Sequence, residues 1–149
     1  MNQIELKNKL SEIKDKLDAI EQKAENRIYL TCKAENACAV NRFLLEDIGA
    51  RFCVATGIDA DDCFEIIYHY SYDQTGCCIN IKAVISDREK PAIESITPFL
   101  PAAEWAEREI HDILGIDFKN HPNLRRLILA DDWPEGVYPM RKEIKATNT

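Results

Sequence analysis

Residues 64–85 constrain the fold of this chain more than any other stretch, because two alternating segments flank a turn. Side chains at alternate positions of a strand share one face of a sheet. The predicted buried face holds Phe64, Ile66, Tyr68, Tyr70, Ile79, Ile81, Ala83 and Ile85. Residues 73–76, Asp-Gln-Thr-Gly, are typical of a turn. The pattern therefore predicts a β-hairpin with one buried face.

A helical pattern fills residues 4–24 near the N-terminus. Apolar residues recur there at spacings of three and four, at Leu6, Leu10, Ile13, Leu17 and Ile20, as on one face of an amphipathic helix. Such a face either forms a coiled-coil seam or packs against the sheet of its own domain. Two heptads leave both interpretations open.

Shorter elements connect these two segments and follow the hairpin. Strands are predicted at residues 27–33, 51–56 and 93–96, a helix at residues 37–48 and a loop at residues 57–62. Asn36 is the expected cap of this helix and Gly49 its stop. The aspartates of the loop lack the ligand spacing of an EF-hand, so we interpret them as surface residues.

A second clearly marked helix is predicted at residues 102–114. Its apolar positions follow the helical period, Pro101 suits its first turn, and Gly115 suits the left-handed residue that ends it. Opposite charges four residues apart predict exposed ion pairs worth about 0.2 to 0.5 kcal/mol each. These pairs involve Glu104, Arg108 and Asp112.

An extended arm is predicted after Phe118, because the chain becomes polar and contains three prolines. Residues 127–129 are the one apolar segment by which this arm could contact the body. His121 precedes a proline, which favours extended backbone and should present the imidazole at the root of the arm. Arg125 and Arg126 suit bidentate contacts with carboxylates. For these arginines, an anchor to the body and an interface with a neighbour are both open.

The cysteines are interpreted as small apolar residues of the core. They are Cys32, Cys38, Cys53, Cys63, Cys77 and Cys78. No C-x-x-C knuckle is present, and adjacent cysteines on a strand point to opposite sides. A small metal-binding or redox protein that uses these cysteines is the alternative function.

The charge distribution limits the possible partners. A net charge of -7 argues against a general nucleic-acid binder. Residues 1–118 carry a net -9 and residues 119–149 a net +2, so the mildly basic end is either a solvated terminus or an interface. No apolar run reaches the roughly 18 residues of a membrane span, and the N-terminus lacks a signal-peptide core. We therefore expect a cytoplasmic protein without a membrane span.

Enzyme motifs are absent from the sequence. There is no nucleophile elbow, dinucleotide-binding turn, phosphate loop or H-E-x-x-H pair. His111 and Asp112 are adjacent on a helix and face different directions, so we interpret His111 as a structural partner of Glu107 one turn earlier. We predict no catalytic residue, no cofactor-binding residue and no metal ligand in this chain.

The helix at residues 102–114 and the arm together resemble the signature of the 30-kDa subunit family of respiratory complex I. This family includes shorter subunits of membrane-bound energy-converting NiFe hydrogenases. The resemblance covers residues 33–142, with strands at residues 64–69 and 93–96, and its many ordered positions make it specific. The residues that carry it are Glu107, Arg108, Glu109, Asp112, Gly115, Ile116, Phe118, His121, Pro122, Leu124, Arg125, Arg126, Asp132, Trp133, Pro139, Arg141 and Lys142.

The resemblance implies a cofactor-free peripheral subunit at the cytoplasmic face of a membrane. It would dock on the large catalytic subunit of a complex I or NiFe hydrogenase assembly, whose partner subunits carry NiFe, Fe–S clusters or quinone. The implied structural signature is Glu107, Arg108, Glu109, Asp112 and Gly115. The implied partner interface is His121, Pro122, Leu124, Arg125, Arg126, Asp132, Trp133, Pro139, Arg141 and Lys142.

Two departures from the family pattern leave the exact partner open: the final motif has one extra residue before Pro139 and no proline at residues 143–144, and the longer tail of complex I members is missing. The short length favours a hydrogenase-type or similarly compact complex. We expect a single two-layer α+β domain over residues 1–149, with a mixed or antiparallel sheet packed against helices. Its parts are an N-terminal amphipathic helix (1–25), an α+β core (26–118) and an extended C-terminal arm (119–149). A stand-alone module that dimerises through residues 6–20 is a third hypothesis.

Overall fold

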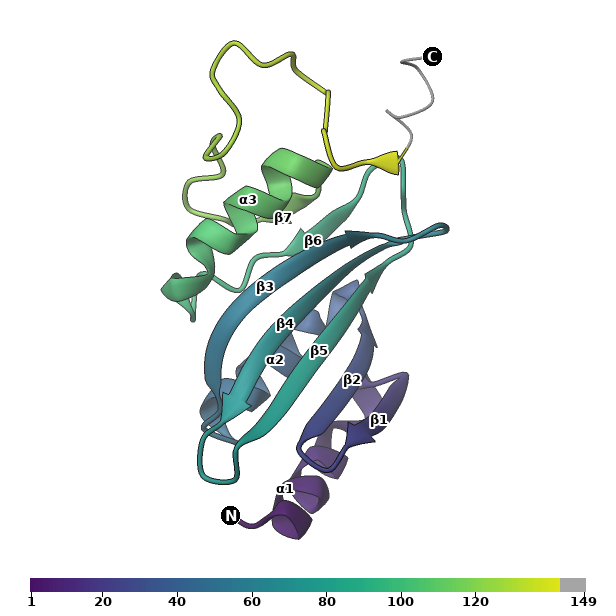
Figure 1. The fold of residues 1–149 in the computed structure, drawn as a ribbon, viewed down its shortest axis with the longest axis vertical. Coiled ribbons are helices and arrows are strands. Elements are labelled where there is room, and N and C mark those ends of the chain that lie inside the picture. The colour runs from purple at the N-terminus through teal and green to yellow at the C-terminus, as the bar shows by residue number, and fades with distance from the viewer. Residues whose placement is uncertain (143–149) are drawn as a thin grey trace.

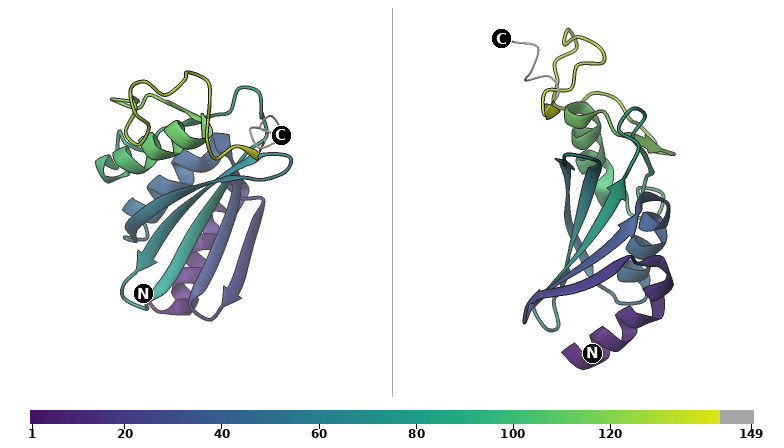
Figure 2. Two further views of the ribbon diagram at one scale, coloured as in Figure 1. Left: turned by 45° about the horizontal axis from the view of Figure 1, so that its top comes forward. Right: turned by 90° about the vertical axis from the view of Figure 1, so that its right-hand side faces the viewer.

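A five-stranded sheet with helices on one face forms the body of the computed structural model, which describes residues 1–142 (Figures 1 and 2). The end of the predicted arm and the position after Lys142, where the family proline is missing, lie outside these residues. The elements in chain order are α1 (Gln3–Leu10), η1 (Ser11–Lys16), β1 (Ala19–Ala24), β2 (Arg27–Lys33), η2 (Ala34–Asn36), α2 (Ala37–Glu46), β3 (Arg51–Asp59), β4 (Phe64–Tyr72), β5 (Cys77–Ile85), β6 (Ala92–Glu94), η3 (Pro101–Ala103), α3 (Glu104–Leu114) and β7 (Asp117–Lys119).

The sheet is mixed, as one of the two predicted alternatives required. Its strand order is β1-β2-β5-β4-β3, with β2 and β5 parallel and the other neighbours antiparallel. The predicted hairpin is confirmed, with Phe64 opposite Ile85 and Tyr72 opposite Cys77. A separate pair, β6 and β7, is parallel. The prediction of a two-layer α+β domain is therefore confirmed.

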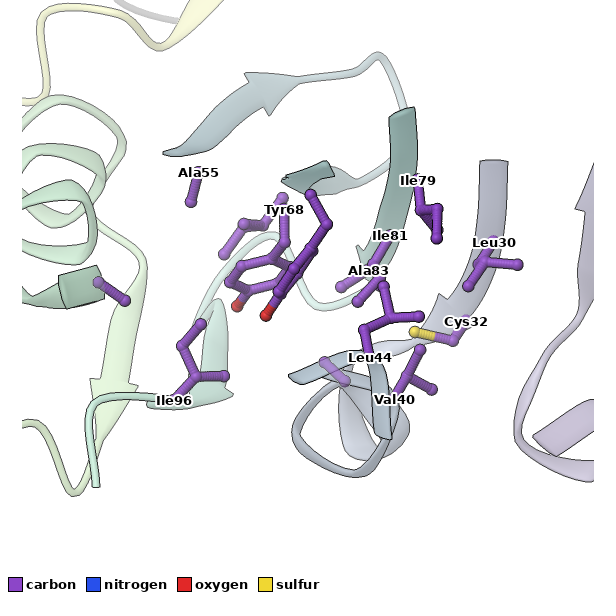
Figure 3. Close-up of a cluster of buried hydrophobic side chains, with 14 of the residues drawn as sticks. Leu30, Cys32, Val40, Leu44, Ala55, Tyr68, Ile79, Ile81, Ala83 and Ile96 are labelled. Carbon is purple, nitrogen blue, oxygen red and sulfur yellow. The ribbon is translucent and has the colours of Figure 1, made fainter. Parts of the chain in front are cut away.

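The core lies between the inner face of this sheet and the helices (Figure 3). The eight predicted apolar positions of the hairpin are all buried. In the close-up, Cys32 lies among apolar side chains of the sheet and of α2, including Leu30, Val40 and Leu44. This cysteine therefore fills space in the core, as predicted.

The predicted N-terminal helix at residues 4–24 is wrong beyond its first turns, and so is the boundary of an amphipathic helix at residues 1–25. Residues 19–24 form the edge strand β1, which pairs with β2 across a tight turn at residues 25–26. Pairing with a neighbouring strand overrides local helical preference here. Leu6 and Leu10 are 1% exposed in the core. Packing on the domain's own sheet was thus the correct alternative. Because these side chains are buried in the core, they are not available as an interface for dimerisation.

The region from α2 to β3 follows the predictions with two differences. Asn36 occupies the cap position, but its side chain donates to the Lys16 carbonyl instead of capping α2. The strand β3 continues to Asp59, so the predicted loop begins later. Gly57 explains why α3 can approach this strand: a Cβ there would lie 2.7 Å from Leu114 Cδ1.

Candidate functional site

The face of α3 that meets the arm is lined by buried charged side chains. Glu107, Arg108 and Asp112 are 0%, 7% and 3% exposed. The predicted exposed ion pairs Glu104–Arg108 and Arg108–Asp112 are wrong, because Arg108 and Asp112 bind backbone groups of the arm instead. A buried charge needs such partners to offset its desolvation. The site is therefore the contact between α3 and the arm.

Arg108 and Asp112 fix the path of residues 125–129. The Arg108 guanidinium donates from Nε to the Arg125 carbonyl at 3.0 Å and from Nη2 to the Arg126 carbonyl at 2.8 Å. Asp112 Oδ2 accepts from the backbone N–H groups of residues 127, 128 and 129 at 2.7, 2.8 and 3.2 Å. Burial alone would raise the pKa of Asp112, but these donors outweigh it and hold the pKa below its ordinary value.

Glu107 forms the centre of a second cluster under the arm, in which it is surrounded by uncharged groups. Its carboxyl accepts from Ser95 Oγ at 2.5 Å and from the Ile96 N–H at 2.9 Å, and Ser95 Oγ also contacts Thr97 Oγ1 at 2.7 Å. Burial raises the pKa of Glu107 to about 7, although these hydrogen bonds oppose the rise. The predicted partner His111 does not contact it; His111 Nδ1 lies 2.9 Å from the Ile116 carbonyl.

His121 lies at the root of the arm, where its imidazole is buried. Its side chain is 0% exposed. Nδ1 accepts from the Asn123 N–H at 3.0 Å, and Nε2 faces the Glu104 carbonyl at 3.1 Å. These partners specify a neutral ring with its proton on Nε2. Nε2 also lies 3.8 Å from Glu107 Oε2, so the ring closes the Glu107 cluster from the side of the arm.

Residues 141 and 142 of the arm are anchored near the C-terminus of α3 and at β3. Arg141 Nε donates to the Leu114 carbonyl at 2.7 Å, where a cation complements the helix dipole. The Arg141 guanidinium also stacks over Phe64 and Tyr138. The backbone N–H of Lys142 donates to Asp59 Oδ2, and its ammonium lies 2.6 Å from Asp61 Oδ1. These two predicted interface residues therefore bind the chain's own body.

Gly115 ends α3 as predicted, with a φ of +70°. A Cβ at this position would overlap the ring of Tyr138, which the arm lays over the helix end. Left-handed backbone and close approach both require glycine here. Sequence reasoning missed Tyr138 and Ser95. It also missed the burial of Glu107, although its spacing from Ile110 and Leu114 by three and seven residues places it on their helix face.

Other predicted interface residues lie on the outside of the arm. The Arg125 side chain is exposed and makes no hydrogen bond or ion pair within residues 1–142. Arg126 turns back, since Nη1 donates to the carbonyls of residues 130 and 131. Arg126 therefore binds the arm itself, and Arg125 faces outward. Pro122 and Asp132 are exposed, Leu124 and Pro139 are half-buried, and Trp133 is 36% exposed with Nε1 bound to the Val137 carbonyl.

The cysteines are dispersed over the fold. All six are free thiols, and the described residues contain no group of three or more His, Cys, Asp or Glu placed to share a metal ion. Burial raises the pKa of Cys32 to about 12 and that of Cys38 to about 11, so both thiols stay protonated. The geometry therefore gives no support to the alternative of a shared cysteine site. Within residues 1–142, no helix has the length and apolarity needed to cross a bilayer.

Comparison with known proteins identifies a family and several relatives. The model of the family "Respiratory-chain NADH dehydrogenase, 30 Kd subunit" matches residues 30–149. A subunit of the NADH-quinone oxidoreductase of Citrifermentans bemidjiense is 36% identical over 131 residues, which cover 85% of this chain and 78% of that one. Formate hydrogenlyase subunit 5 of Escherichia coli is 34% identical over 123 residues, which cover 80% of this chain and 21% of that one.

A solved structure has the same fold. It is a chain of the membrane-bound sulfane sulfur reductase, an archaeal respiratory membrane complex, and it superimposes with a TM-score of 0.79 at 24% identity. The superposition covers 93% of this chain and 83% of that chain. The α3 helix and the arm, which carry the signature residues, fall within the span that the family model matches.

Proposed function

Because the chain belongs to the 30-kDa subunit family of respiratory-chain NADH dehydrogenase, we propose that it is a peripheral subunit that docks on the large catalytic subunit of its complex. The assembly is a complex I-like NADH:quinone oxidoreductase or an energy-converting NiFe hydrogenase. Relatives of both kinds cover at least 80% of this chain. Its role would be to position and stabilise the electron-transfer assembly.

The observation that carries this proposal is that signature residues hold the arm on α3. Arg108, Asp112 and Arg141 hold main-chain groups of the arm or of α3. They turn a segment without regular secondary structure into a fixed surface on the body. Such pre-organisation favours binding, because less conformational freedom is lost when a partner docks.

The outward side of this fixed arm supplies the docking contacts in the proposal. Arg125 offers a planar cation for a carboxylate, and Ile128, Trp133 and Met140 are 58%, 36% and 60% exposed. Exposed apolar side chains with an arginine among them are typical of interface anchors. His121, Arg126, Arg141 and Lys142 would act indirectly, since they hold the surface in shape.

We extend the proposal to chemistry and location. The chain would bind no cofactor, and the NiFe centre, Fe–S clusters or quinone would belong to partner subunits. It would lie at the cytoplasmic face of the membrane and be held there by those subunits. Electron transfer and its coupling to ion movement would then be properties of the assembly.

An affinity pull-down tests the proposal. The tagged chain is extracted from its native membranes in mild detergent, and mass spectrometry identifies the proteins that accompany it. A large subunit related to the quinone-site or NiFe-bearing subunits should be recovered with the chain. Recovery of the folded chain alone would refute the proposal.

Charge reversal at two exposed arginines distinguishes a specific contribution of Arg125 to docking from a general effect of net charge. Arg125→Glu should reduce recovery of the large subunit and leave the thermal midpoint unchanged, because its side chain binds nothing in residues 1–142. Arg27→Glu changes an exposed arginine at the start of β2 and serves as the matched control. Equal recovery with both variants would argue against the arm as the interface.

A further inference from the structure

An open groove with apolar walls lies between the edge of the sheet and the arm. Its volume is about 410 Å³, and the residues that line it include Phe52, Val54, Trp105, Glu109, Leu127 and Ile128. Three of these side chains are unusually exposed for apolar residues: Trp105 at 66%, Ile128 at 58% and Val54 at 48%. Clustered exposure of this kind marks interaction sites, whereas single exposed apolar residues are ordinary.

The walls of this groove are rigid. One wall is α3, and the opposite wall is the arm segment whose backbone Asp112 holds through three N–H groups. The third side is the edge strand β3, whose register with β4 shifts between Phe52 and Val54. Irregular edges of this type discourage the addition of another strand. The groove is therefore suited to side chains of a partner, which it can receive without rearranging.

The charges on the groove indicate the chemistry of the partner. Glu109 lies on the groove, is exposed, and makes no hydrogen bond or ion pair with any residue of the described chain. A docking partner that buried this exposed carboxylate would have to supply a positive charge. A complementary segment thus combines large apolar side chains with a lysine or arginine.

We infer that this groove receives a short segment of the large subunit that presents one or two large apolar side chains beside a lysine or arginine. The inference rests on the proposed function. Formate hydrogenlyase subunit 5 supports this occupant, because there the homologous region is part of a much longer polypeptide, of which the match covers 21%. The groove also shares Leu127 and Ile128 with the arm, so it is continuous with the proposed docking surface.

Site-specific cross-linking tests the occupant. The photoreactive residue p-benzoylphenylalanine replaces Trp105 in the tagged chain, or Ile4 as the control, which is 71% exposed on α1. After illumination of native membranes, position 105 should cross-link to a large-subunit peptide that contains an apolar residue near Lys or Arg, and position 4 should not. A cross-link from position 105 to another subunit or to a second copy would overturn the inference.

Two substitutions test the binding energy. Trp105→Ala should weaken binding of the large subunit at least about tenfold, as expected of a tryptophan anchor. Glu109→Lys should also weaken binding, and its effect should grow as the salt concentration is lowered. Ile4→Ala and Glu12→Lys, both exposed on other elements, should leave it unchanged. If the Trp105→Ala variant binds the large subunit with wild-type affinity, the groove is not the binding site, but the proposed function is unaffected. If the wild-type chain recovers no large subunit, the proposed function fails as well.

Discussion

Replacing Glu107 by glutamine should remove one component of the pH dependence of stability. The pKa of this carboxyl is about 7 in the folded chain and 4.5 in its ordinary state. Well below pH 4.5 the Glu107 carboxyl is protonated in both the folded and the unfolded state, so burying it costs the folded state no ionisation free energy. As the pH rises to 7 the unfolded state loses its proton first, so the folded state loses about 3 kcal/mol of stability over this window.

The assay is urea unfolding at several pH values from 4.5 to 8, followed by tryptophan fluorescence. The difference in unfolding free energy between Glu107→Gln and the wild type should rise by about 3 kcal/mol from pH 4.5 to pH 7 and then stay level. Glu109→Gln, an exposed position on the same helix, is the matched control. A flat difference for Glu107→Gln would refute the assignment of a buried carboxyl with a raised pKa.

Three further outcomes follow from the same contacts. Asp112→Ala leaves three backbone donors unpaired and should cost about 2 to 3 kcal/mol, with faster tryptic cleavage in the arm than in the sheet; equal cleavage would contradict the anchor. Gly115→Ala should destabilise the chain more than Gly136→Ala, because both have positive φ but only the former meets Tyr138; equal melting temperatures would contradict this. Metal analysis of the purified chain should find no stoichiometric zinc or iron, and finding either would revive the cysteine alternative.

Local patterns were sufficient for the hairpin and for the C-terminal end of α3. The alternation of residues 64–85 and its turn are contained in one short stretch, and Gly115 acts on the helix that it ends. The helical period of residues 4–24 failed where β1 formed, because the hydrogen bonds of an edge strand come from a partner strand. Sequence alone could not decide between these two local outcomes.

The candidate site was predicted by residue but not by role. Arg108 and Asp112 had the spacing of an exposed ion pair, yet each binds backbone atoms 15 to 18 residues away. No local pattern reports such a contact. His121 likewise belongs to a buried cluster that only the return of the arm creates. The side chain of Arg126 binds the arm itself, which neither of the two open alternatives described.

The contacts at residues 125–129 separate the shape of the arm from its composition. Arg108 and Asp112 bind carbonyl and N–H groups, which every residue except proline possesses in full. The exposed side chains of Arg125 and Ile128 can therefore be exchanged while the backbone keeps its course, whereas Arg126 also holds the arm through its side chain. The exposed side chains of the arm can thus change while its backbone stays fixed on α3. Recognition of a different assembly could be acquired, or engineered, at these positions without rebuilding the fold.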